Sequence, residues 1–155
     1  MASSSNSGGR QAWLRRRPVS LPPGMLAAMP TPDQVKAVAE AYVAASNAND
    51  KDAVLAQFAP DTVWFDPVGQ PPHVGVEGVS SFYDQTRALA DRVEMKLRDV
   101  IVCGTEAAMI LEIHVTMGDS GMIMDCIETL EVDDDGKIAA MKAYWDMSRA
   151  RTRDA

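Results

Sequence analysis

The fold of this chain can be predicted from MILEIHVTMGDSGMIMDCIETLEV, residues 109–132, because polar and apolar side chains alternate along it. Alternation with a period of two indicates two β-strands, 109–117 and 122–132, each with one face turned to the core. On the first strand the polar face carries Glu112 and His114. Two such strands joined by a short turn predict an antiparallel sheet with one covered face. On the second strand the face expected to point inward carries Met122, Met124, Cys126, Glu128, Leu130 and Val132.

The same period continues on both sides of this stretch, from Val93 onward and again between the Asp133–Gly136 turn and Trp145. Before Val93 the spacing is helical, and Thr31 followed by Pro32 predicts the start of a first helix. Helices followed by long strands with short turns indicate an α+β fold, in which an antiparallel sheet curves around the helices and leaves a pocket at one end. The expected earlier elements are helices over about 32–47, 52–58 and 77–91, a strand over 62–66 and a loop over 67–75.

The length of 155 residues is that of one domain. The first 28 residues differ from the rest, because their Ser/Asn/Gly run and their prolines cannot bury enough apolar surface to order the chain. We therefore expect residues 1–28 to be a disordered tail, or to come from a start site assigned too early. Residues 29–148 are expected to form the domain and residues 149–155 a C-terminal tail. The run Arg15-Arg16-Arg17 is similar to an export signal, but no adequate apolar region follows it.

The composition argues against several classes of function. The net charge of −7 disfavours binding to nucleic acid and to anionic membranes. No apolar run approaches the roughly 20 residues that a membrane helix needs. Cys103 and Cys126 have no metal-ligand spacing, so we expect reduced core thiols in a cytoplasmic protein. We likewise expect neither a metal nor a cofactor.

Three residues are candidates for chemistry, and each has a structural alternative. Glu128 lies on an apolar strand face, where a carboxyl group should keep its proton and act as a hydrogen-bond donor. A register slip or a bulge would instead turn Glu128 to solvent. Tyr42 lies on the apolar face of the first helix, either as a catalytic phenol or as a core tyrosine whose hydroxyl needs a partner. Asp66 ends a short strand, either as a catalytic carboxylate or as part of an Asp-Pro turn.

The run Asp66-Pro67-Val68-Gly69-Gln70-Pro71-Pro72 resembles the signature loop of bacterial ketosteroid isomerase, the steroid Δ-isomerase. Phe82-Tyr83 and Ala143-Tyr144-Trp145 resemble two further pieces of that family, and Tyr42 precedes Asp66 by the family's spacing of 24 residues. The resemblance covers most of the chain between Thr31 and Met147. It implies the α+β fold shared with nuclear transport factor 2 and the SnoaL-like proteins, in which a curved antiparallel sheet forms a cone over about three helices.

The resemblance also implies a role for each matching residue. Asp66 matches the general base, and Tyr42 matches a hydrogen-bond donor to the oxyanion. Glu128 stands where the family has a protonated aspartate as a second donor, so the acid is kept but is one methylene longer. Tyr83 matches a tyrosine that supports the donor network, whereas Phe58 replaces a networked tyrosine of one branch and implies a shorter network. The residues expected to bind the substrate are Tyr83, Trp145, Met141, Phe58 and Met124.

The implied reaction converts a 3-oxo-Δ5-steroid into the conjugated 3-oxo-Δ4-steroid by intramolecular proton transfer through a dienolate, without a cofactor. Bacterial ketosteroid isomerase is itself a known case of the pKa tuning that this reaction needs. The resemblance further implies a homodimer that uses the outer sheet face, near Glu112, His114 and Lys142. Two alternatives remain open, since one fold hosts many functions. They are another cone-fold enzyme, such as a polyketide cyclase or an epoxide hydrolase, and a non-catalytic module that binds an apolar ligand.

Overall fold

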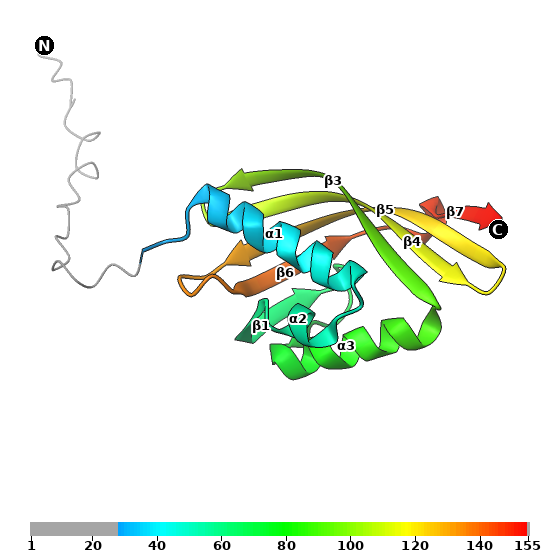
Figure 1. Cartoon of the computed structure of the whole chain (residues 1–155), viewed down its shortest axis with the longest axis horizontal. Coiled ribbons are helices and arrows are strands. Elements are labelled where there is room, and N and C mark those ends of the chain that lie inside the picture. Colours follow the sequence, from blue (N-terminus) through cyan, green and yellow to red (C-terminus); the bar gives the residue numbers. More distant parts are fainter. Residues whose placement is uncertain (1–27, 155) are drawn as a thin grey trace, which may run out of the picture.

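The computed structural model describes residues 28–154, which form helices packed against one large curved sheet (Figure 1). The helix α1 lies across the concave side of the sheet, and α3 runs beside β1. The helices are α1 (Pro32–Asn47), α2 (Lys51–Leu55), α3 (Gly75–Leu89) and the 3-10 helix η1 (Met147–Arg149). The strands are β1 (Phe58–Phe65), β2 (His73–Val74), β3 (Arg92–Cys103), β4 (Glu106–Met117), β5 (Ser120–Val132), β6 (Ile138–Tyr144) and β7 (Arg151–Asp154).

The strand order in the sheet is β2-β1-β6-β5-β4-β3, and β7 pairs with the first part of β5. The four long strands β3 to β6 pair antiparallel, as their alternation and short turns predict. The sheet departs from antiparallel pairing at one place, because β1 pairs with β6 in parallel. Parallel neighbours need a long crossover connection. Here that connection consists of β2, α3 and the meander from β3 to β5, and the sheet is therefore mixed.

The start of α1 lies where the sequence predicts it, whereas several other boundaries differ. The Thr31 hydroxyl accepts a hydrogen bond from the Gln34 amide at 3.3 Å, and the Gln34 side chain accepts one from the Thr31 amide at 2.8 Å. This reciprocal pair is a capping box, which satisfies two amides that the first helical turn leaves free. The second helix ends at Leu55 rather than near residue 58, because Phe58 already pairs with Ile138 at the start of β1.

The structure describes the C-terminal end of the chain up to residue 154, but not residues 1–27. Residues 1–28 were expected to be a tail, and all of them except Ala28 lie outside the described part. Residues 149–155 were also expected to be a tail, but they contain β7, which pairs antiparallel with Ser120–Ile123. The backbone hydrogen bonds of this short strand extend the edge of β5 beyond the end of β6.

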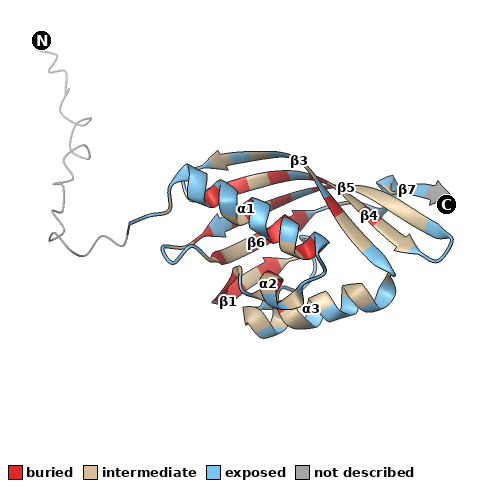
Figure 2. Ribbon diagram, viewed as in Figure 1, coloured by how far each residue is buried: buried red, intermediate tan, exposed pale blue. Residues whose placement is uncertain are grey.

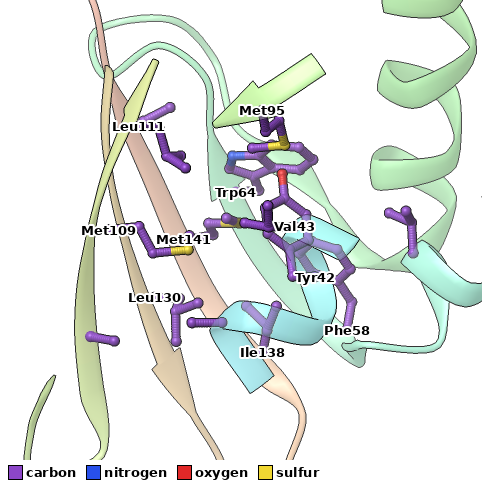
Figure 3. Packing of buried hydrophobic residues seen from close by; sticks show 14 of the residues in the cluster. Tyr42, Val43, Phe58, Trp64, Met95, Met109, Leu111, Leu130, Ile138 and Met141 are labelled. Carbon is purple, nitrogen blue, oxygen red and sulfur yellow. The ribbon is translucent and has the colours of Figure 1, made fainter. Parts of the chain in front are cut away.

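The core lies between α1 and the concave face of the sheet (Figure 2). The buried side of α1 carries Val35, Ala39 and Tyr42, spaced as a helix that buries one face requires. Figure 3 shows Tyr42 and Val43 of this helix opposite Met109 and Met141 of the strands. None of the helices among the described residues is long and apolar enough to cross a membrane. The fully buried sheet residues include Met109, Leu111, Leu130, Ile138 and Met141.

Candidate active site

A cavity of about 480 Å³ lies between the concave sheet face and the two helices α1 and α3. Its walls are mainly apolar, and this is the size and character of a pocket for a small apolar molecule. Few polar side chains reach it, which makes those few informative. They are Tyr42, Ser46, Asp66, Tyr83, Thr86, Arg87, Glu128 and the indole of Trp145. The apolar lining includes Met95, Ile113, Val115, Met117, Met122 and Met124.

Asp66 follows the last residue of β1. Hydrogen bonds from Trp145, just after β6, and to Ala143, within β6, fix its position and that of the loop after it. The indole nitrogen Nε1 of Trp145 donates a hydrogen bond to Asp66 Oδ1 at 2.6 Å. The amide of Val68 donates to the carbonyl of Ala143 at 2.9 Å, which ties the loop after Asp66 to the same strand. Burial raises the pKa of Asp66 to about 6, and the hydrogen bond from Trp145 opposes this rise. The carboxyl is therefore mainly ionised near neutral pH, yet basic enough to accept a proton.

Glu128 lies in the middle of β5, between Met109 of β4 and Ala143 of β6. Both neighbours are fully buried, and Glu128 itself is only 4% exposed. The register shift in β5 falls at Glu131 and Val132, beyond Glu128, so neither a slip nor a bulge turns this carboxyl to solvent. Burial, and then the charge of Asp66, raise the pKa of Glu128 to about 8. Its atom Oε2 is buried without a hydrogen-bond partner in the described structure. Glu128 is thus a neutral acid near pH 7, and so a hydrogen-bond donor.

Tyr42 projects from α1 toward the same cavity and is 3% exposed. Its ring meets Phe58 and Trp64 edge-on, with ring centroids 5.9 and 6.3 Å apart. Burial raises the pKa of Tyr42 well above its usual value, and the charges of Glu128, Asp66 and Cys126 raise it further. A hydrogen bond with the Ser46 side chain acts in the opposite direction. The phenol therefore keeps its proton over the physiological range and can donate it in a hydrogen bond.

The structure brings Tyr42, Asp66 and Glu128 to one cavity, together with Trp145 and Met124. Two residues expected in its walls do not line it. Phe58 is 3% exposed and stacks on Trp64 at 5.6 Å between centroids, and Met141 is 1% exposed in the core. Both belong to the core rather than to the cavity wall, and Met141 faces inward as the alternation predicts. Cys103, expected in the core, is exposed at the end of β3, whereas Cys126 is buried as expected.

Tyr83 lines the cavity, but its hydroxyl does not serve the role that the resemblance implies. It donates a hydrogen bond to the side-chain oxygen of Asn49 at 2.8 Å. Asn49 stands after the end of α1 with a φ of 54°, a left-handed conformation that asparagine tolerates better than most residues. The hydroxyl of Tyr83 is thus used to hold the turn after α1, and the donor network around Tyr42 does not pass through it.

Sequence reasoning did not single out Ser46 and Arg87 as site residues. Ser46 had a signal, since it lies four residues after Tyr42 on the same face of the helix. No sequence pattern pointed to Arg87, because a basic residue on a largely polar helix is usually exposed to solvent. Its guanidinium donates to the carbonyls of Ser46 and Val93 at 2.9 and 3.2 Å, and it lies over the ring of Tyr83 at 5.0 Å. It therefore closes one side of the cavity.

The arrangement combines one ionised carboxylate with two protonated donors inside apolar walls. Such a set can remove a proton from carbon next to a ketone and stabilise the oxyanion that forms. Within residues 28–154, no group of three or more histidine, cysteine, aspartate or glutamate side chains is placed to hold a metal ion.

The chain is similar in sequence to a known family and to a known enzyme. The family described as a SnoaL-like domain matches residues 39–141. A steroid Delta-isomerase of Nocardioides simplex is 31% identical over 113 residues, which are 72% of this chain and 89% of that enzyme.

Among the solved structures that share the fold, three are similar over nearly their whole length. RV0760c from Mycobacterium tuberculosis has a TM-score of 0.72 at 24% identity, covering 80% of this chain and 99% of that one. The second is the epoxide hydrolase/cyclase-like enzyme SalBIII, which is described as having a role in pyran ring formation in the polyether salinomycin. It has a TM-score of 0.72 at 18% identity, covering 78% of this chain and 97% of that one. A computationally designed 17-OHP binder has a TM-score of 0.71 at 21% identity, covering 79% and 98%. At these identities the three structures show the cone fold alone.

Proposed function

Because the chain belongs to the family of SnoaL-like domains and is similar to a steroid Delta-isomerase, we propose that it isomerises a 3-oxo-Δ5-steroid to the conjugated 3-oxo-Δ4-steroid. Asp66 is the base, and Tyr42 and Glu128 are the two donors to the substrate oxygen. The reaction needs no cofactor, because one proton leaves the substrate and returns to it. Cys103 and Cys126 are free thiols, which agrees with a cytoplasmic location for this enzyme.

The proposed mechanism has two proton transfers. The Asp66 carboxylate removes a proton from the carbon between the ketone and the double bond. The electron pair of the broken C–H bond forms a double bond to the carbonyl carbon, and the π pair of the carbonyl moves onto its oxygen, which becomes the oxyanion of a dienolate. Asp66 then gives the same proton to the far carbon of the former double bond, and the double bond ends in conjugation with the ketone. Tyr42 and Glu128 donate hydrogen bonds to the oxyanion and keep their own protons throughout.

One observation carries this proposal: two carboxyl groups share an apolar cavity but differ in protonation near neutral pH. The pKa of Asp66 is about 6, and that of Glu128 is about 8. A base must be ionised to accept a proton, whereas an acid must be neutral to donate a hydrogen bond to a developing negative charge. Preorganised donors in a cavity that excludes water stabilise such a charge strongly. A pocket that only binds an apolar ligand gains little from a buried acid.

The direct test follows the absorbance of the conjugated ketone when purified protein is mixed with a 3-oxo-Δ5-steroid. Asp66→Asn should lower kcat by about 10²- to 10⁴-fold, the usual contribution of a general base. Asp61→Asn is a matched control, because Asp61 is an exposed carboxylate on β1 outside the cavity. Folded wild-type protein without turnover would contradict the proposal, and turnover of an epoxide or another ketone in its place would favour a different cone-fold enzyme.

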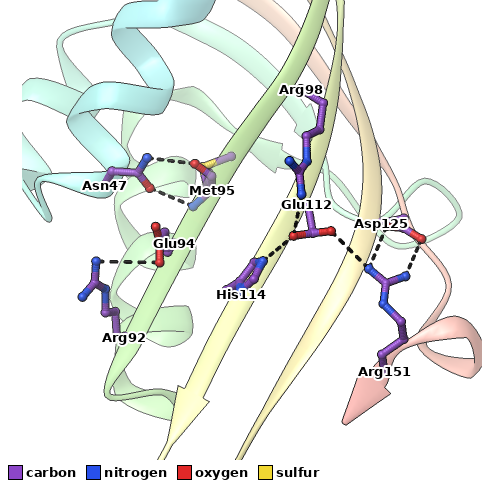
Figure 4. Close-up of polar contacts among 9 residues, drawn as sticks. All are labelled: Asn47, Arg92, Glu94, Met95, Arg98, Glu112, His114, Asp125 and Arg151. Atoms are coloured by element: carbon purple, nitrogen blue, oxygen red, sulfur yellow. Dashed lines mark hydrogen bonds and ion pairs between the residues drawn. The ribbon is translucent and has the colours of Figure 1, made fainter. Parts of the chain in front are cut away.

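We also propose that the protein forms a homodimer through the outer face of β4, β5 and β6. Ile110, Ile127 and Tyr144 are 40%, 48% and 46% exposed there, beside a groove of about 660 Å³. Charges of both signs surround them, as a self-complementary face requires. Glu112 contacts Arg98 at 3.0 Å and Arg151 at 3.4 Å, as drawn in Figure 4.

His114, which the resemblance places on this outer face, is only 7% exposed and contacts Glu112 through Nε2. Sedimentation velocity tests the dimer. Ile127→Glu should give a monomer because it places a charge in the apolar centre of the face, whereas Ile101→Glu, an exposed position on β3 outside the groove, should leave the dimer intact. A wild-type monomer, or a dimer that survives Ile127→Glu, would contradict this interface.

A further inference from the structure

Ser46 lies one helical turn after Tyr42 and faces the same cavity. Residues four apart lie on one face of an α-helix, so the two side chains are neighbours along α1. Ser46 is 5% exposed and lines the cavity beside Tyr42. A buried serine in the last turn of a helix is unusual without a partner for its hydroxyl, since burial of an unpaired hydroxyl is costly.

The phenol of Tyr42 needs a hydrogen-bond partner because it is buried. The two positions at which the family has network tyrosines supply none: Phe58 has no hydroxyl, and the hydroxyl of Tyr83 donates to Asn49. Ser46 is placed to meet this need, because it lies one turn along the same buried face, and its side chain lowers the pKa of Tyr42 against the larger effect of burial. The acidity of the phenol therefore depends on a residue that lies on the same helix.

The backbone around Ser46 is fixed from two sides, so the last turn of α1 that carries its hydroxyl stays in place. Arg87 Nη2 donates to the Ser46 carbonyl at 2.9 Å. The side chain of Asn47 donates to the carbonyl of Met95 at 2.9 Å and accepts from its amide at 2.7 Å (Figure 4). These contacts attach the last turn of α1 to β3 and α3. They orient both Ser46 and Tyr42, since the two share that helix.

We propose that Ser46 is a positioning residue, which donates a hydrogen bond to the phenol oxygen of Tyr42 while Tyr42 donates its own proton toward the oxygen of the ligand. As negative charge develops on the ligand oxygen, part of it is passed to the phenol oxygen, where the Ser46 hydroxyl stabilises it. The inference extends the proposed isomerase site and rests on Tyr42 as a donor. It also predicts an effect on any bound phenol or enolate, with or without turnover.

The experiment compares Ser46→Ala with Thr62→Val, using 2-naphthol as a small phenolic probe. Alanine is a good helix former, so α1 should be retained. Thr62→Val is the matched control, because Thr62 is fully buried, its hydroxyl has no partner, and it does not line the cavity. Ser46→Ala should weaken 2-naphthol binding and lower kcat by about 3- to 10-fold, the effect of one hydrogen bond, with KM changed less than twofold. Thr62→Val should change neither value.

A second measurement separates this inference from the isomerase proposal. In free protein labelled at the tyrosine ring carbons, the ¹³Cζ resonance of Tyr42, assigned with Tyr42→Phe, should move in Ser46→Ala and stay in Thr62→Val. This shift needs neither a substrate nor binding of the probe. If Ser46→Ala leaves the resonance unmoved, the inference is wrong. If the resonance moves but wild-type protein isomerises no steroid ketone, the Ser46 contact stands and the isomerase proposal fails.

Discussion

The pH dependence of kcat/KM should be bell-shaped, because the two carboxyl groups of the cavity must be in opposite protonation states. Asp66 acts only when ionised, so activity should rise with pH through its pKa of about 6. Glu128 donates a hydrogen bond only when neutral, so activity should fall with pH through its pKa of about 8. The expected maximum lies near pH 7, between the two values.

The size of the effect follows from these pKa values. One pH unit below the pKa of Asp66, only about a tenth of this carboxyl is ionised, so kcat/KM at pH 5 should be roughly a tenth of its maximum. One unit above the pKa of Glu128, about a tenth of that acid is still neutral, which gives a similar loss at pH 9. Because the charge of Asp66 is one cause of the raised pKa of Glu128, the two limbs describe a coupled pair.

The assay measures initial rates of conjugated ketone formation from pH 4.5 to 10, at substrate concentrations well below KM. Glu128→Gln separates the limbs, since an amide also donates a hydrogen bond but does not titrate. This variant should keep the acidic limb near pH 6 and lose the alkaline limb near pH 8. Circular dichroism at each pH shows that the protein remains folded, so that loss of structure is not mistaken for titration.

Two results would refute the reasoning. A profile that is flat from pH 5 to 9 would mean that neither carboxyl titrates in the cavity as its environment predicts. An alkaline limb that persists unchanged in Glu128→Gln would assign that limb to another group. In the second case Glu128 would be a buried structural acid, and the donor role would rest on Tyr42 alone.

Three further predictions concern single residues of the cavity. Tyr42→Phe should lower kcat by about 10²-fold or more in the same assay, because it removes a donor to the oxyanion. Trp145→Phe should move the acidic limb to higher pH, because the indole hydrogen bond holds down the pKa of Asp66. Wild-type stability in urea should fall as pH rises from 4.5 to about 8, because Glu128 keeps in the folded state a proton that it loses in the unfolded chain. The slope from Glu128, about 1.4 kcal/mol per pH unit at most, should be absent in Glu128→Gln above pH 6, whereas below pH 6 the raised pKa of Asp66 leaves a slope of its own.

The sequence predicts the parts of this fold that depend on periodicity. Alternation along β4 and β5 identifies the inward face, and so predicts that Glu128 is buried among apolar residues. The capping box and helical spacing locate α1 and point Tyr42 toward the core. These features are local, because each depends on residues within one element and on the need to bury one face of it.

What the sequence does not predict depends on contacts between distant elements. Alternation shows that Met141 faces inward, but not that the cavity ends before it. Helical phase directs Tyr83 toward the cavity, but not its hydroxyl toward Asn49, which lies 34 residues earlier. The parallel pairing of β1 with β6 is likewise non-local, since no periodicity reveals which strand lies beside which. The role of the Arg87 guanidinium is hidden for the same reason.

Asp66 and Glu128 differ in protonation because their surroundings differ, and the charge of Asp66 increases the difference between their pKa values. Asp66 is only partly buried and receives a hydrogen bond from Trp145, which favours its ionised form. Glu128 is enclosed by apolar neighbours, and its Oε2 has no partner in the described structure, which favours its neutral form. Once Asp66 is ionised, its charge raises the pKa of Glu128 further. Asp66→Asn should therefore remove the base and also lower the pKa of Glu128, which NMR titration of the Glu128 side-chain carboxyl carbon can measure in the inactive variant. An unchanged pKa there would mean that burial alone keeps Glu128 neutral.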